Sequence, residues 1–301
     1  MASTLTHPRE QDCTGSRVGV TRRQFDVPAP LRLWHLASFD APSIAVVWAL
    51  GFAWAAQIHL PHWVPVLLAL ATWAVYVGDR LLDARAGLRS GTLHHLRDRH
   101  YFHWRHRGVL LVLAVSAAGA AAAIIFSLMP LGIRAHDSVL AVAALAYFSG
   151  VHSDRKVAQV APAFLSRILS KEFLVGVLFT AGCFLPTLSR ATASHLTLLW
   201  PVCGVAVFFA ALAWLNCRSI ECWESGKASC VPAACLLGLG GLLLAASFAG
   251  AQPRPAALLA AGAISAMLLA LLDRIRGRLT PLALRVAADL VLLTPIALVL
   301  R

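Results

Sequence analysis

Charged residues are scarce in this chain, because only 13% of its 301 residues are Asp, Glu, Lys or Arg. A water-soluble domain carries about 25%, so the composition excludes an ordinary soluble globular protein. Acidic residues are the scarcest, with 14 against 26 Lys and Arg, which leaves a formal net charge of +12. Such an excess can indicate nucleic-acid binding, but in so apolar a chain it is better explained by basic loops beside a membrane. We therefore expect a lipid bilayer as partner and no nucleic acid.

Several common signatures are also missing. None of the seven cysteines forms a Cys-x-x-Cys pair, and most lie in apolar runs, where a free thiol behaves as a small hydrophobic side chain. The sequence therefore predicts neither disulfides nor zinc. It contains no P-loop, no Gly-x-Gly-x-x-Gly and no visible repeat. Residues 1–28 are polar and lack the apolar core of a secretory signal, so we expect a disordered cytoplasmic tail.

Apolar sequence is what the chain has in abundance, with 59% hydrophobic residues and a mean hydropathy of +0.72. It predicts an all-α polytopic membrane protein with nine transmembrane helices. The nine runs are 43–58, 63–78, 109–128, 138–151, 172–188, 196–215, 230–250, 256–272 and 281–300. Before the first run, residues 29–42 mix apolar and polar side chains, which indicates a short helix at the membrane interface.

The distribution of basic residues orients these helices. Lys and Arg gather in the loops after even-numbered runs, and the other loops and the C-terminus hold only Arg134, Arg190, Arg254 and Arg301. Cytoplasmic loops are the ones that carry excess Lys and Arg. The pattern therefore predicts an N-terminus in the cytoplasm and a C-terminus outside.

A pair of carboxylates ends the second run. Asp79 and Asp83 lie four residues apart, so on a helix they share one face, about 5–6 Å apart at Cβ. Two carboxylates so close repel each other, and a Mg²⁺ ion between them removes that conflict. In the alternative interpretation, Arg80 and Arg85 neutralise the pair at a helix end. The spacing alone favours neither.

A second polar stretch, residues 216–227, follows the sixth run on the same predicted side. Glu221 and Glu224 share a helix face there, and Asn216 lies two turns before Glu224. Two acidic stretches at one membrane face predict a shared cavity in a single helical bundle. Two separately solvated loops are the alternative.

These features resemble the UbiA superfamily of intramembrane prenyltransferases. The first family motif, Asn-x-x-x-Asp-x-x-x-Asp, is matched at Asp79 and Asp83, with Val75 at the Asn position. The second family loop is similar to Arg218, Ile220, Glu221, Gly226 and Lys227, with Ser219 in place of an Asp. Between the motifs, Tyr147, Lys156, Lys171, Gly176 and Gly182 resemble the family's tyrosine, basic stretch and glycine-containing fifth span.

The resemblance implies a UbiA-like domain over residues 29–301 in a bacterial inner membrane. Its implied activity is Mg²⁺-dependent transfer of a prenyl group from an isoprenyl diphosphate to an aromatic or other lipophilic acceptor. Implied catalytic residues are Asp79, Asp83 and Lys171; diphosphate-binding residues are Arg85, Lys156 and Arg218; metal ligands are Asp79, Asp83, Asn216, Glu221 and Glu224. Such groups would neutralise the departing pyrophosphate, while an apolar cavity keeps the allylic cation from water.

Other classes stay open at the level of sequence. A di-iron oxygenase is one, because five histidines gather in one loop and imidazole suits iron; they are His94, His95, His100, His103 and His106. The sequence Asp79–Arg85 touches the CDP-alcohol phosphotransferase pattern but lacks its further Asp pair. A catalytically degenerate homologue that acts as a transporter or assembly partner would show the same hydropathy. In the last run, Arg285 and Asp289 have a spacing that predicts an internal ion pair.

Overall fold

The computed structural model describes residues 25–89, 98–135, 137–138, 171–192, 195–226 and 229–300. Within these ranges the regular elements are helices, and one isolated bridge joins Phe25 to Leu279. Most of the predicted tail, and the predicted run 138–151 beyond its first residue, lie outside the described residues.

Helices cover the other predicted runs. Their bounds are α1 Ala29–Leu36, α2 Asp40–Ala55, α3 Trp63–Arg89, α4 Asp98–Arg105, α5 Arg107–Leu128, α8 Lys171–Leu188, α9 Leu196–Ser225, α10 Val231–Phe248, α11 Pro253–Ile275, α12 Pro281–Leu290 and α13 Ile296–Val299. Two short 3₁₀ turns, Arg276–Arg278 and Val291–Leu293, continue α11 and join α12 to α13.

Six of the described segments are long and apolar enough to cross a membrane, and a seventh is obtained if α1 and α2 count as one bent span. Helix α8 is apolar but shorter. An all-helical fold of the described residues is therefore confirmed, and its long apolar helices suggest an integral membrane protein. The count of nine spans and the orientation with the N-terminus in the cytoplasm stay predictions.

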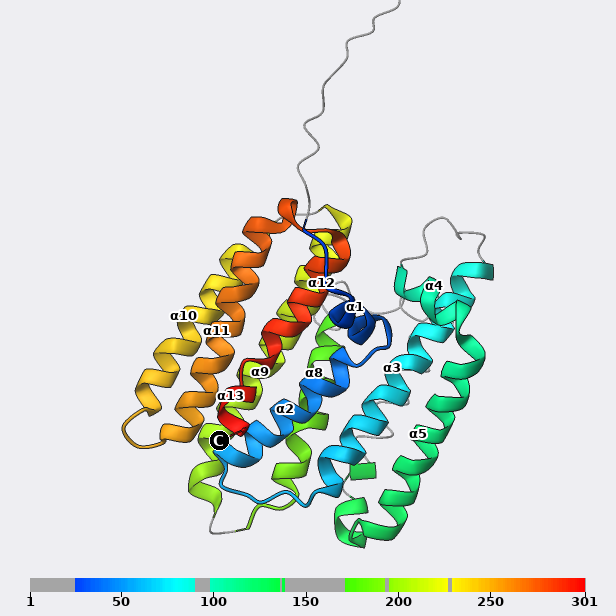
Figure 1. Ribbon diagram of the computed structural model, residues 1–301. Coiled ribbons are helices and arrows are strands. Elements are labelled where there is room, and N and C mark those ends of the chain that lie inside the picture. The colour runs from blue at the N-terminus through cyan, green and yellow to red at the C-terminus, as the bar shows by residue number, and fades with distance from the viewer. Residues whose placement is uncertain are drawn as a thin grey trace, which may run out of the picture.

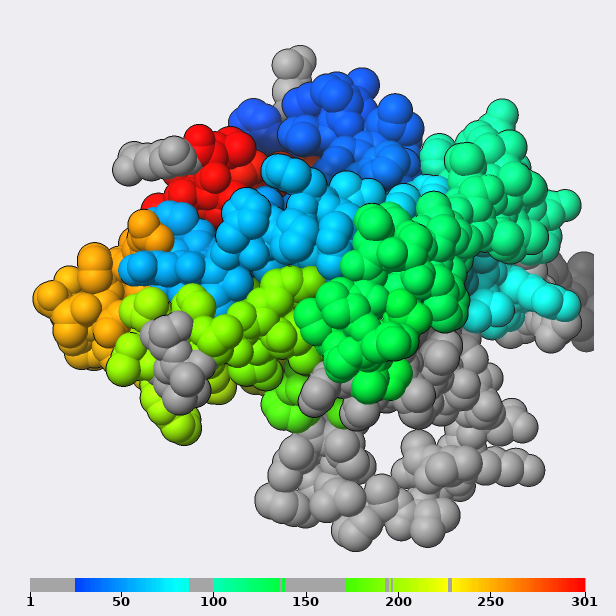
Figure 2. All heavy atoms as spheres, turned by 90° about the horizontal axis from the view of Figure 1, so that it is seen from below, coloured from blue at the N-terminus to red at the C-terminus, as the bar shows by residue number. Residues whose placement is uncertain are grey.

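The helices lie side by side in one bundle (Figure 1). Helices α10 and α11 form one margin, α3 and α5 form the other, and α2, α8 and α9 lie between them. Figure 2, which looks along the bundle from below, shows the same order, with α11 in orange at one margin and α5 in green toward the other. The outer face of α5 exposes apolar side chains such as Val112 and Val115, as a lipid-facing helix requires.

Aromatic side chains form the centre of the core. The rings of Trp48 and Phe209 stack with their centroids 3.9 Å apart, and Phe52 packs edge-on against Phe209. The indole of Trp48 donates to the carbonyl oxygen of Leu292 at 2.9 Å, which satisfies the polar end of a buried ring. This cluster fastens α2 to α9 and to the C-terminal segment.

A sharp bend of 86° separates α1 from α2. Ser38 has a positive φ of 64° at the bend, and its side chain contacts Nε2 of His103 in α4 at 3.1 Å. The indole of Trp73 in α3 donates to the carbonyl oxygen of Ala37 at 2.9 Å. The predicted short helix before the first span is thus present. It ends at Leu36, and α2 begins at Asp40, three residues before the predicted start.

Both predicted acidic stretches lie at one end of the bundle. The C-terminal ends of α3 and α9 and the bend after α1 all lie at the top of Figure 1, whereas the chain's C-terminus lies at the opposite end. Two stretches far apart in sequence are therefore brought to the same end, as the loop pattern predicts.

Candidate functional site

The acid pair lies where α3 approaches the polar end of the bundle. Asp79 and Asp83 are half-buried, and Arg85 is exposed. Val77, two residues before Asp79, packs in one cluster with Leu110 and Ala114 of α5. By helical geometry, the two carboxylates therefore lie on a different side of α3 from the face that contacts α5.

Arg80 takes a position that the sequence did not indicate. It is only 4% exposed, its Nη2 lies 3.4 Å from Oδ2 of Asp40 and its Nη1 donates to the carbonyl oxygen of His35 at 3.4 Å. The guanidinium thus reaches the bend between α1 and α2. This contact gives Arg80 a carboxylate partner other than those proposed in the helix-end interpretation of Asp79 and Asp83.

The polar end of α9 has one ion pair within the helix and two polar contacts to α12. Arg218 donates to Glu221 at 2.5 Å within α9, Glu224 forms an ion pair with Arg285 of α12, and the amide of Asn216 donates to Oδ1 of Asp289 at 3.5 Å. The predicted pairing of Arg285 with Asp289 is replaced by these contacts, because both side chains turn towards partners outside α12.

Two implied basic residues lie at or beyond the edge of the described residues. Lys156 lies outside the described residues, and Lys171 is placed only as the first residue of α8. The histidine-rich loop is described in part: His103 is fully buried beside Ser38, and Nδ1 of His106 contacts the carbonyl oxygen of Phe102. His94 and His95 lie outside the described residues.

A buried polar cluster is the feature that sequence reasoning missed. Nδ1 of His35 lies 2.9 Å from Oδ2 of Asp40 and 3.2 Å from Oδ2 of Asp289. Among the residues that the structure describes, these three form the one group of His, Cys, Asp or Glu ligand atoms that all lie within 4.8 Å of one another. The implied metal ligands Asp79, Asp83, Glu221 and Glu224 are not in it.

No spacing pattern in the sequence predicts that these three residues lie together. His35 and Asp40 are five residues apart across a bend, so no helical spacing links them. Asp289 is the exception, since an acidic residue inside an apolar run indicates a polar role. What its partners are depends on how α12 packs against α1 and α2.

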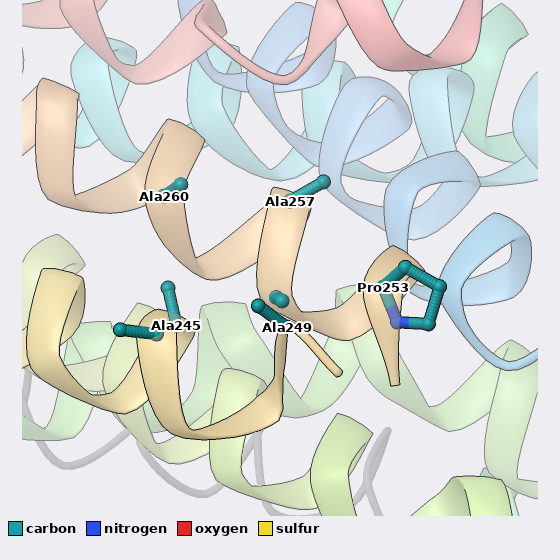
Figure 3. A pocket seen from close by; sticks show the side chains of 7 residues that line it. Ala245, Ala249, Pro253, Ala257 and Ala260 are labelled. Carbon is teal, nitrogen blue, oxygen red and sulfur yellow. The ribbon is translucent and has the colours of Figure 1, made fainter. Parts of the chain in front are cut away.

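A shallow groove between α10 and α11 is purely apolar (Figure 3). Ala245, Ala249, Pro253, Ala257 and Ala260 line it, with Ala246 and Ala256. It lies next to the loop that joins the two helices, at the end of the bundle opposite the polar residues (Figure 1). With no titratable or nucleophilic side chain in its lining, the groove offers packing surface and no chemistry.

No family model, curated protein or solved structure matches the chain. The site must therefore be interpreted from its own residues.

Proposed function

We propose that the chain is an integral membrane prenyltransferase, which transfers a prenyl group from an isoprenyl diphosphate to an aromatic or other lipophilic acceptor. The observation that carries the proposal is the position of the acid pair of α3, which lies at the same end of an apolar bundle as the polar end of α9 (Figure 1). A diphosphate is anionic and its prenyl tail is apolar, so a donor needs both environments next to each other.

The acid pair is suited to Mg²⁺. Asp79 and Asp83 provide carboxylate oxygens, which are the ligands Mg²⁺ prefers together with phosphate oxygens, and their half-buried position leaves them accessible from the polar end. When bound there, the ion would supply charge that stabilises pyrophosphate as a leaving group. We assign metal binding to Asp79 and Asp83.

The surface beside the acid pair supports binding of the prenyl tail. Val75 and Leu82, which are 49% and 44% exposed, lie seven residues apart on α3 and so share a face next to the two aspartates. An isoprenoid chain laid along this apolar stripe would place its diphosphate at Asp79 and Asp83. An apolar surrounding would also protect an allylic cation from water.

Basic side chains complete the proposed diphosphate site. Arg85 is exposed two residues after Asp83, near the same end of α3, and the side chain of Arg218 is 41% exposed although it pairs with Glu221. Both are able to donate to phosphate oxygens, which Arg binds through two parallel hydrogen bonds. Lys156 and Lys171 keep the roles that the resemblance implies.

The excess of Lys and Arg supports a cytoplasmic location for this end of the bundle and, with it, a bacterial inner membrane. The diphosphate group of the donor is polar, so a site at the cytoplasmic end of the bundle would receive donors from the cytoplasm.

The proposal is tested by release of pyrophosphate from the purified full-length chain in detergent or nanodiscs. Prenyl diphosphates of several lengths are supplied with a range of aromatic acceptors, with Mg²⁺ and after its removal by a chelator. We expect release that depends on both acceptor and Mg²⁺. If no donor and acceptor pair supports release above the protein-free rate, the enzyme proposal is wrong and the degenerate-homologue alternative takes its place.

A further inference from the structure

The buried cluster of His35, Asp40 and Asp289 has the dimensions of a metal site. Ligands about 2.1 Å from one ion are separated by roughly 3.0 Å at right angles and roughly 3.4 Å in a tetrahedron. The measured separations, 2.9 Å and 3.2 Å from Nδ1 of His35 to the two carboxylate oxygens, match these values. All three ligand atoms lie within 4.8 Å of one another, so one ion could contact all of them.

Polar atoms in the cluster lack the partners that burial demands. Nδ1 of His35 is paired with both carboxylates, at 2.9 Å and 3.2 Å. His35 is 2% exposed and Asn216 is 5% exposed, yet Nε2 of His35 and Oδ1 of Asn216 have no hydrogen-bond partner among the described residues. Buried polar atoms of this kind usually cost stability unless a water or an ion satisfies them. The amide nitrogen of Asn216 faces Oδ1 of Asp289 at 3.5 Å, so a flip of that amide, which exchanges its nitrogen and its oxygen, would turn the oxygen towards the cluster.

Charge also favours a cation. Asp40 and Asp289 contribute two negative charges, while Arg80, 3.4 Å from Asp40, contributes one positive charge. With a neutral imidazole the cluster retains one excess negative charge in an apolar bundle, where unbalanced charge is costly. A protonated His35 would cancel this charge, whereas a divalent ion would change it to one excess positive charge, so the charge count calls for a cation without choosing between the two. The experiment below separates them.

We propose that His35, Asp40 and Asp289, with Asn216 as a fourth ligand, bind a divalent first-row transition-metal ion such as Zn²⁺. Imidazole and carboxylate together suit Zn²⁺ and Fe²⁺, whereas Mg²⁺ is held by oxygen ligands alone. This site is distinct from the proposed Mg²⁺ site at Asp79 and Asp83. The side chain of Asp289 is the most exposed of the three at 14%, so an ion enters from its side.

The position of the site predicts a structural role for the ion. His35 lies in α1, Asp40 begins α2, Asn216 lies in α9 and Asp289 lies in α12. An ion held by all four would join the bend at the start of the bundle to its last helix. The site shares Asn216 with the metal ligands that the resemblance implies, but it shares no residue with the Mg²⁺ site proposed at Asp79 and Asp83. The inference therefore does not rest on prenyl transfer.

Zn²⁺ binding to the full-length chain in detergent tests the proposal. We expect one Zn²⁺ per chain after dialysis, by metal analysis and by titration calorimetry. Asp289→Asn and His35→Gln should each weaken binding at least about 100-fold, since even residues that only support a ligand cost 10–100-fold. Asp26→Asn, the same change at an exposed aspartate outside both proposed metal sites, should leave Zn²⁺ binding intact.

Thermal unfolding gives a second readout, in which each protein is compared with itself with and without Zn²⁺. Added Zn²⁺ should raise the Tm of the wild type and not that of Asp289→Asn, because only a specifically bound ion stabilises the folded state. A double Cys222→Ser, Cys230→Ser variant should keep the effect, which excludes binding by these buried thiols. Absence of stoichiometric Zn²⁺ in the wild type, or undiminished binding by Asp289→Asn, would overturn the site and leave a protonated His35 to balance the charge.

Discussion

Two groups of carboxylates lie at the same end of the bundle and differ in their surroundings. Asp79 and Asp83 come from one helix and are half-buried, so a ligand from solution can reach them. Asp40 and Asp289 come from opposite ends of the chain, and Asp40 is 3% exposed beside a buried histidine and a buried arginine. Under the two proposals these groups have different tasks: the open pair, Asp79 and Asp83, binds Mg²⁺ and an anionic substrate, and the closed cluster of His35, Asp40 and Asp289 holds helices together.

Arg80 belongs to the closed cluster although its neighbour in sequence, Asp79, belongs to the open pair. Replacing Arg80 with Met would leave the buried carboxylate of Asp40 without this partner, which typically costs about 3–5 kcal/mol of stability. Unfolding of the purified protein in mixed micelles measures the loss. Arg85→Gln is the matched control, because removal of an exposed charge changes stability by less than about 0.5 kcal/mol. Equal stability of the two variants would show that Arg80 does not support the closed cluster.

The closed cluster, unlike the open pair, depends on how helices pack, since α9 brings Asn216 to it. A Cβ atom added at Gly176 of α8 would lie 3.0 Å from the backbone nitrogen of Trp214 and 3.1 Å from the carbonyl oxygen of Ala210, both in α9. Backbone cannot move aside as a side chain does, so Gly176→Ala should lower stability by about 1–3 kcal/mol.

Gly182 is the matched control for this contact. A Cβ atom added there meets nothing within 4 Å, and Ala is favoured over Gly in a helix by up to about 1 kcal/mol. Gly182→Ala should therefore be neutral or stabilising in the same unfolding assay. Similar losses in both variants would mean that close α8–α9 packing is not what the glycine at 176 provides.

Much of the architecture could be predicted because single helices reveal it. The length and position of the apolar runs predicted α3, α5, α9, α10 and α11 to within a few residues at most ends. Helix α3 is the clearest difference: it continues to Arg89, beyond the predicted end at residue 78, because charged residues do not stop a helix that leaves the membrane. Such features depend on local sequence alone.

The closed cluster could not be predicted because it depends on packing between distant segments. Nothing in the spacing of His35 and Asp40 shows that a bend of 86° will turn them towards each other. The pairing of Arg285 was also predicted wrongly, since its nearest acid in sequence is Asp289 and its partner in the structure is Glu224. Which carboxylate an arginine contacts in a bundle is decided by the neighbouring helix as much as by its own.

The central claim is that the open pair, Asp79 and Asp83, holds Mg²⁺ against the diphosphate. It is tested most directly by the rate of pyrophosphate release across a Mg²⁺ titration, compared between the wild type, Asp83→Asn and Asp26→Asn. Asp26 is an exposed aspartate before α1 and provides the same chemical change away from the pair. We predict that Asp83→Asn lowers turnover on the order of 10²–10³-fold, the usual cost of losing one group that stabilises a transition state, while Asp26→Asn matches the wild type. Turnover of Asp83→Asn equal to that of the wild type at every Mg²⁺ concentration would contradict the claim.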